Sequence, residues 1–217
     1  MNGDVKVLKK YKAKLMIKKS RHIDYFNKLD NNIQIDIIKR IDELIIEEKE
    51  YCDKGNYGHL CNILSAISLY EVLQKHGKSE EESLNIVGEE MYKYIQKSKI
   101  KFQKMSKRIW FWGLMKKIIP IGFKIGSGYG WRFTWHNTNS KNKFKFEINE
   151  CIYQKIFKKR HLEKLGPVFC KCDIINYGEL NSIDFQRTKT LCYGDDECNF
   201  IFVKHKKGES FTRTKAK

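Results

Sequence analysis

The chain has 217 residues, 41% of them hydrophobic and 13% aromatic, which excludes a disordered protein and allows a buried core. Its formal charge of +17 raises the question of a nucleic-acid or membrane partner. The positive charges are spread along the chain, without an arginine-rich helix or a DNA-binding motif. We therefore interpret them as a lysine-rich, solvated surface and expect no nucleic-acid and no membrane partner.

The N-terminal half of the chain is predicted to be helical. Isoleucine and leucine recur at helical spacing over residues 31–52, which predicts an amphipathic helix. A second helix is expected over 59–76, because an apolar run ends there before Gly77.

A third helix begins with a capping signal. Ser79 and Glu82 have the spacing of a capping box, in which each side chain bonds to the backbone amide of the other residue. We expect this helix to run to about Ser98, with more helix over 99–117.

The pattern changes after Pro120. Aromatic and polar residues alternate over 131–135, and apolar and charged residues alternate over 144–148, so both segments are predicted strands. The polar stretch 137–142 between them is the expected hairpin loop.

The C-terminal part repeats the order of helix and hairpin. Residues 150–176 are expected to be helical, followed by strands over 183–192 and 198–204 that are joined by a turn. Strands and helices are thus segregated along the chain, which predicts an α+β fold with N-terminal helices on an antiparallel sheet built from two hairpins.

The predicted organisation has three parts. Residues 1–55 form a basic helical arm, residues 56–205 an α+β domain, and residues 206–217 a flexible basic tail. The seven cysteines are an odd number without regular spacing, which argues against a secreted disulfide scaffold. No secretory signal or membrane-spanning run is present, so we expect a cytoplasmic protein.

Reactive side chains gather in the last third of the chain, where five of the seven cysteines follow position 150. Four short motifs occur there in order: Cys151-Ile152-Tyr153, Cys170-Lys171-Cys172-Asp173, Phe185-Gln186-Arg187-Thr188-Lys189-Thr190 and Gly194-Asp195-Asp196-Glu197-Cys198-Asn199-Phe200. Over roughly residues 60–203 the chain resembles the L-2-amino-thiazoline-4-carboxylic acid hydrolase family.

The resemblance implies a fold and an activity. It implies an α+β fold similar to 4-vinyl-reductase-type ligand-binding domains. It also implies hydrolysis of a cyclic amidine-like C=N bond without a cofactor, with 2-amino-thiazoline-4-carboxylate opened to N-carbamoyl-L-cysteine. Cys172, Cys192 and the first 50 residues lie outside the family pattern.

Cys170 and Asp173 are the first catalytic candidates. If their segment is helical, residues three apart share one face, so the thiol and the carboxylate point into one pocket. A thiolate is a nucleophile, and the carboxyl group can carry a proton to a departing nitrogen. The alternative is a buried cysteine beside an exposed aspartate.

Cys151 is the rival nucleophile. It lies where a strand is expected to pass into a helix, and a helix N-terminus lowers the pKa of a thiol. The alternative is simple packing at the end of the strand.

Arg187 lies among apolar residues of a predicted strand and therefore needs an anionic partner. Either it binds a substrate carboxylate, or it forms a structural pair with Asp173 or a glutamate. Thr188 faces the other side of the strand and is more easily explained as sheet packing, but it is kept as a substrate-binding candidate with Trp131 and Trp135.

Two further hypotheses remain open. Cys192 and Cys198 flank a five-residue turn, so with Cys151 they form a candidate zinc site, although the chain has no C-x-x-C pair; we expect no metal. The main alternative to an enzyme is a sensor-like module that binds a small molecule between Trp131, Phe133 and Trp135 without turnover. The sequence does not define the substrate or the oligomeric state.

Overall fold

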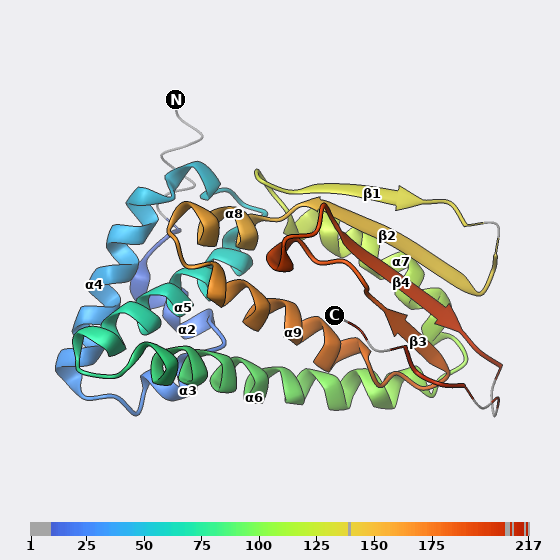
Figure 1. Cartoon of the computed structure of the whole chain (residues 1–217), viewed down its shortest axis with the longest axis horizontal. Coiled ribbons are helices and arrows are strands. Elements are labelled where there is room, and N and C mark those ends of the chain that lie inside the picture. Colours follow the sequence, from blue (N-terminus) through green and yellow to red (C-terminus); the bar gives the residue numbers. More distant parts are fainter. Residues whose placement is uncertain (1–9, 139, 207–208, 210, 215, 217) are drawn as a thin grey trace. The chain divides into compact units, whose positions relative to one another are not determined.

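The computed structural model describes residues 10–138, 140–206, 209, 211–214 and 216 (Figure 1). The chain divides into two compact units. The first contains the described residues up to Tyr94 together with Ile125–Tyr129, and the second contains Ile95–Lys124 and the described residues from Gly130 onward. The described part of the predicted N-terminal arm therefore lies inside the first unit.

The first unit is a bundle of helices: α2 (Ala13–Lys19), α3 (Ile23–Phe26), α4 (Asn31–Glu47) and α5 (Tyr57–Lys75). A short 3-10 turn, Lys49–Tyr51, follows α4. Helix α5 is buried on most of its circumference, since α2 and α4 both pack against it. Both predicted helices of this region are confirmed.

The predicted capping box is also confirmed at the start of α6 (Glu80–Ser106). The amide of Glu82 donates to Ser79 Oγ at 3.1 Å, and the amide of Ser79 donates to Glu82 Oε2 at 2.8 Å. Each side chain satisfies an amide that has no partner within the helix.

Helix α7 (Phe111–Gly126) corrects the prediction for the middle of the chain. Helix was expected only to about residue 117, because Pro120 removes a backbone donor. The helix continues past Pro120, and its first turns are held by the buried side chains of Phe111, Trp112 and Met115. Tertiary packing here outweighs the helix-breaking tendency of proline.

The glycine-rich loop after α7 belongs to the first unit. The Asn56 side chain donates to the Tyr129 carbonyl at 2.9 Å and accepts from the Gly128 amide at 3.0 Å. The Tyr129 amide donates to Asp53 Oδ2 at 2.7 Å. A Cβ atom on Gly128 would overlap the carboxylate of Asp53, so only glycine allows this approach.

The second unit contains a four-stranded antiparallel sheet in the order β1-β2-β4-β3. The strands are β1 (Arg132–His136), β2 (Lys143–Glu150), β3 (Ile183–Gln186) and β4 (Cys198–Lys204). The α+β class with an antiparallel sheet is thus confirmed. Phenylalanine rings form its core: Phe146 stacks on Phe200 with centroids 4.8 Å apart, and Phe185 packs at a tilt against Phe202 with centroids 5.0 Å apart.

The predicted strand over 183–192 is too long. After Gln186 the amides of Thr188 and Lys189 donate to the side chain of Asn199, each at 2.8 Å, instead of to a neighbouring strand. The segment then turns into a 3-10 helix, Leu191–Tyr193. A side chain that satisfies these backbone donors ends the strand early.

The predicted helical segment 150–176 consists of two helices, α8 (Ile152–Lys159) and α9 (Gly166–Tyr177). Between them lie His161, with a φ of 56°, and the 3-10 turn Glu163–Leu165. The change of direction between α8 and α9 brings residues of α9 close to the end of β3.

The described part of the C-terminal tail contacts the second unit. Arg213 donates to the carbonyl oxygens of Gly178, Leu180 and Ile183 at 2.7–3.2 Å. The hydroxyl of Thr214 donates to Asp184 at 2.8 Å.

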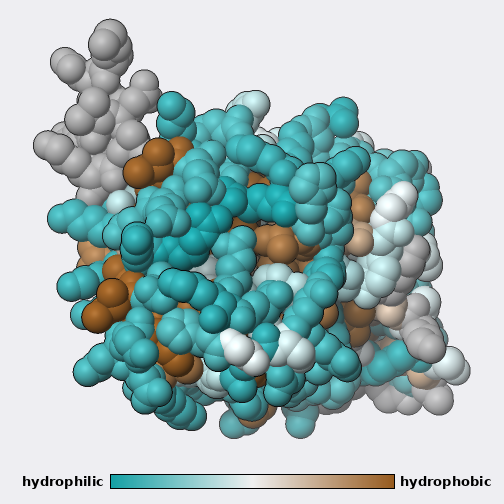
Figure 2. Space-filling view, turned by 60° about the vertical axis from the view of Figure 1, so that its left-hand side comes forward, coloured by the Kyte–Doolittle hydropathy of each residue, from teal (hydrophilic) through white to brown (hydrophobic). Residues whose placement is uncertain are grey.

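The surface in Figure 2 is mostly hydrophilic, with hydrophobic side chains in separate areas. Within the described ranges, none of the helices has both the length and the apolar character needed to cross a membrane.

Candidate functional site

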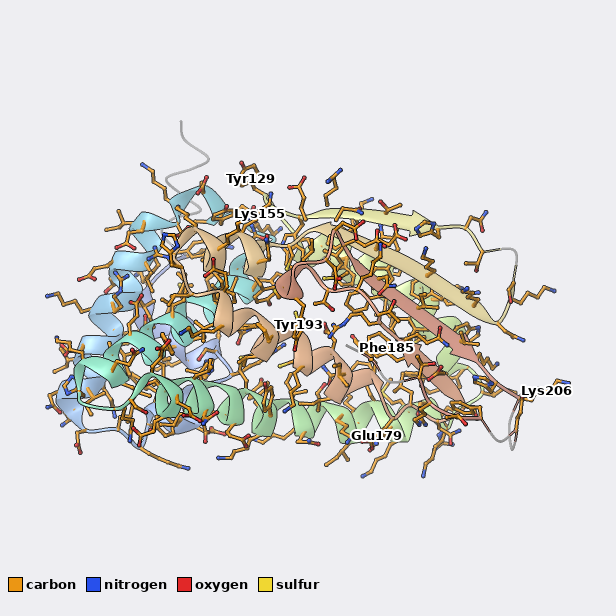
Figure 3. All side chains as sticks on the ribbon, in the orientation of Figure 1. Tyr129, Lys155, Glu179, Phe185, Tyr193 and Lys206 are labelled. Atoms are coloured by element: carbon orange, nitrogen blue, oxygen red, sulfur yellow. The ribbon has the colours of Figure 1, made fainter. Side chains whose placement is uncertain are left out.

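Arg187 lies at the centre of the candidate site, directly after β3 (Figure 3, where Phe185 of β3 and Tyr193 of the following 3-10 turn are labelled). Its side chain is 1% exposed. Nη1 donates to Asp173 Oδ2 at 2.8 Å, and Nη2 donates to the Cys170 carbonyl oxygen at 2.8 Å. The predicted pairing of Arg187 with Asp173 is confirmed.

Aromatic rings surround the buried guanidinium. Its central carbon lies 5.9 Å from the ring centroid of Phe185 and 5.5 Å from that of Phe200. A desolvated cation gains from the negative faces of such rings, and this gain adds to the ion pair with Asp173. The sheet thus provides a place for a buried charge, and α9 provides its counter-ion.

Cys170 and Asp173 lie in a helix, α9, as the sequence predicted. The two residues are one helical turn apart. Arg187 bonds to the carboxylate of Asp173 and to the backbone carbonyl of Cys170. Cys170 is half-buried, and the Asp173 side chain is 36% exposed. The Cys172 thiol is buried and donates to the carbonyl of Val168 within the helix at 3.5 Å, so it serves packing.

Cys192 is the neighbour of Cys170 that the sequence did not predict. It was expected in a strand opposite Cys198, but it lies in the 3-10 turn after Thr190. A hydrogen bond with Cys170, together with burial, raises the pKa of the Cys192 thiol. The proximity of Cys151 and Cys198 also raises the pKa of the Cys192 thiol, so the four thiols form one cluster.

Gly166 makes this cluster possible. A Cβ atom on Gly166 would lie 2.8 Å from both Cβ and Sγ of Cys192. The first residue of α9 must therefore be glycine for the 3-10 turn to pack against the helix. The dipeptide Gly166-Pro167 was the only sequence signal for this position, since proline is common in the first turn of a helix.

Cys151 occupies its predicted position but lacks the predicted acidity. It is the N-cap residue of α8, between β2 and the helix. The thiol is buried, and burial raises its pKa, although the backbone amides of Gln154 and Tyr153 act in the opposite direction. The prediction of a lowered pKa is wrong because desolvation outweighs the helix N-terminus.

Cys198 completes the cluster at the start of β4. Its sulfur accepts a hydrogen bond from the Leu191 amide at 3.2 Å, and burial raises its pKa to about 12. Among the described residues, no group of three or more histidine, cysteine or acidic side chains has an arrangement that would hold a metal ion.

The aromatic residues predicted to bind substrate lie elsewhere in the second unit. A cavity of about 410 Å³ between α7 and the β1–β2 hairpin is lined by Phe123, Phe133, Trp135 and neighbouring side chains. Trp131 stacks on Phe133, with ring centroids 5.6 Å apart. Thr188 is exposed, and its Oγ1 accepts from the Asn199 side chain at 2.9 Å.

Comparison with known proteins gives one match. The L-2-amino-thiazoline-4-carboxylic acid hydrolase family matches residues 60–202, a range that includes α9, Arg187 and all four clustered cysteines. No curated protein and no solved structure matches the chain. The match covers more than half of the sequence, and the chain therefore belongs to the L-2-amino-thiazoline-4-carboxylic acid hydrolase family.

Proposed function

We propose that this protein is a hydrolase that opens a cyclic amidine-like C=N group in a small carboxylate of the 2-amino-thiazoline-4-carboxylate type, at a site centred on Cys170. The family name supports hydrolase activity. The observation that carries the proposal is that Arg187 bonds at once to Asp173 and to the Cys170 backbone carbonyl, and so fixes the turn of α9 that carries the thiol and the carboxylate.

Cys170 is the better nucleophile of the two candidates. It is half-buried and therefore reachable, whereas Cys151 is buried with a raised pKa. Asp173 is partly exposed, so its carboxylate can exchange a proton with a bound molecule.

The proposed covalent route uses the Cys170 thiol as nucleophile and Asp173 as proton carrier. Cys170 Sγ gives its proton to Asp173 and bonds to the amidine carbon, the C=N electron pair moves to the ring nitrogen, and that nitrogen takes the proton from Asp173. The ring carbon–sulfur bond then breaks, and the ring sulfur leaves as a thiol with a proton from the exocyclic amino group. Water adds to the enzyme-bound carbon and releases the N-carbamoyl product and the Cys170 thiol. In this reaction the leaving atom is sulfur rather than nitrogen.

Arg187 acts best as a positioning residue. Nη1 and Nη2 already bond to Asp173 and to the Cys170 carbonyl, so a substrate carboxylate would have to displace Asp173 to bind there. Trp131, Trp135 and Thr188 are proposed substrate contacts only at the outer parts of the substrate. Trp131 directly precedes β1, Trp135 lies on β1, and Thr188 lies in the exposed segment after β3.

Turnover of 2-amino-thiazoline-4-carboxylate by single variants tests the proposal. We expect Cys170→Ser to lower kcat by about 10³ or more, while Cys172→Ala on the same helix keeps wild-type kcat. Full turnover by the double variant Cys151→Ala, Cys170→Ala would exclude the covalent route.

A second variant separates positioning from binding. Arg187→Lys should lower kcat with little change in KM if Arg187 positions Asp173, and should raise KM if it binds the substrate carboxylate. Quenching of tryptophan fluorescence by the substrate without any product would instead support a binding module that uses the aromatic cavity.

A further inference from the structure

The loop before α7 and the outward face of α7 carry an exposed apolar stripe that the proposed reaction does not use. The most exposed side chain is that of Ile109, at 91%. Trp110, Ile118 and Ile121 are 51–55% exposed, and with the half-buried Leu114 they follow each other at intervals of three and four residues. This spacing places them on one side of a helix.

Only positive charges accompany this stripe. From Lys107 to Lys124 the sequence contains five cationic side chains and no aspartate or glutamate. Lys107, Arg108, Lys117 and Lys124 are exposed, and within the part of the chain that the structure describes none of these four forms an ion pair. The cations are solvated, but a stripe of exposed isoleucines and a tryptophan is unfavourable for a surface that faces only water.

A basic cleft lies at the foot of the same loop. Its volume is about 630 Å³. Its polar lining includes Lys107, Arg108, Lys204, His205 and Lys206, and no acidic residue is among the described residues that line it. Such a cleft fits an anionic group of the size of a phosphate ester.

We propose that the surface formed by Ile109, Trp110, Ile118, Ile121 and their flanking cations binds the surface of an anionic membrane. Trp110 and the isoleucines enter the boundary between headgroups and acyl chains, while Lys117, Lys124 and the basic cleft contact lipid phosphates. Helix α7 would lie in the plane of the membrane rather than cross it, which agrees with the lack of a spanning helix among the described residues.

Charge and apolar character together select this partner. Nucleic acid would use the cations but would leave the isoleucines exposed. A second copy of this chain would cover the isoleucines but would bring two sets of like charges together. An anionic bilayer pairs the cations with lipid phosphates and also removes the isoleucines from water. This proposal departs from the expectation, drawn from the dispersed charge, that the protein has no membrane partner.

Binding to lipid vesicles tests the proposal. The full chain should sediment with vesicles of phosphatidylcholine and phosphatidylglycerol and not with pure phosphatidylcholine vesicles. The double variant Ile109→Ser, Trp110→Ser should bind at least about tenfold more weakly. Its matched control is Ile46→Ser, which removes an isoleucine that is 72% exposed on α4 and should leave binding unchanged.

A charge-reversal pair gives an independent measurement if the first variant does not fold. Lys117→Glu, Lys124→Glu should lose about tenfold or more in affinity, whereas Lys28→Glu, Lys54→Glu, exposed lysines of the first unit, should lose much less. The proposal is overturned if the wild type ignores anionic vesicles at low salt, or if both lysine pairs matter equally. It is also overturned if a DNA duplex competes fully for the same surface, or if the chain dimerises through it without lipid.

Discussion

Arg187 and Asp173 form an asymmetric ion pair: their charged atoms are 2.8 Å apart, but the arginine side chain is 1% exposed and the aspartate side chain 36% exposed. The two partners therefore respond differently to mutation. A buried cation that loses its counter-ion keeps its full desolvation cost, whereas a carboxylate near the surface can return to water. Loss of Asp173 should therefore cost more stability than loss of an acidic residue from an exposed ion pair.

Asp173→Asn should destabilise the protein by about 3 kcal/mol, because it removes the carboxylate that lies 2.8 Å from the buried Arg187 guanidinium. Chemical unfolding measures the change. Asp196→Asn is the matched control, since the exposed pair of Asp196 with Lys189 is surrounded by solvent and should leave stability unchanged. Equal effects of the two substitutions would contradict the buried role of Arg187.

A double-mutant cycle should show strong coupling within the pair. Arg187→Met also removes the hydrogen bond to the Cys170 carbonyl, but the methionine fits among Phe185 and Phe200. We expect Arg187→Met, Asp173→Asn to be more stable than Asp173→Asn alone, since the double variant buries no unpaired charge. Additive losses would show that the two residues act independently.

Gly166→Ala should destabilise the second unit by about 1–3 kcal/mol, because the new methyl group would overlap the Cβ and Sγ atoms of Cys192. Gly113→Ala is the control: it lies within α7 and its Cβ meets no atom within 4 Å, so helix propensity predicts a small gain in stability. Melting temperatures distinguish the two outcomes. The combination Gly166→Ala, Cys192→Ser should not recover, because the overlap includes the Cβ atom.

Acid should destabilise the first unit through His22. This side chain is 1% exposed, and burial lowers its pKa from 6.5 to about 4, although the carbonyl of Val87 acts against that shift. The unfolded chain binds the proton first, so stability is complete above pH 6.5 and falls as the pH decreases toward 4. The expected loss at pH 5 is roughly 2 kcal/mol.

Chemical unfolding of wild type and His22→Gln at pH 7 and pH 5 measures this contribution. The variant should lose less stability between the two pH values than the wild type. Burial also lowers the pKa of His59 to about 4. The losses of stability in acid that the two histidines cause should therefore add. A pH dependence that stays unchanged in both His22→Gln and His59→Gln would contradict the assignment.

Thiol alkylation at neutral pH should begin at Cys170 among the clustered cysteines. Cys170 and Cys192 are half-buried, but the hydrogen bond with Cys170 and burial raise the pKa of the Cys192 thiol. Cys151 and Cys198 are buried, and burial raises the pKa of both thiols. Cys52 and Cys61 in the first unit should also react slowly, since burial raises their pKa values to about 12 and about 11. Mass spectrometry of partly labelled protein gives the order, and early labelling of Cys151 would favour it as the nucleophile.

Local sequence patterns determined the elements whose stabilising contacts are close in the chain. The capping box needs only Ser79 and Glu82, and the helical period of α5 and the alternation in β1 follow from residues a few positions apart. The requirement that Arg187 have an anion also follows from the sequence, because an arginine among apolar strand residues must be paired.

Tertiary structure decided the rest, because the contacts involved join distant segments. The packing of Phe111, Trp112 and Met115 carries α7 past Pro120, and the side chain of Asn199 ends β3. Contact between Gly166 and Cys192 brings a thiol beside Cys170 that no spacing indicates, and burial reverses the expected acidity of Cys151. Desolvation and close packing depend on what surrounds a side chain in space, and a linear pattern does not contain that information.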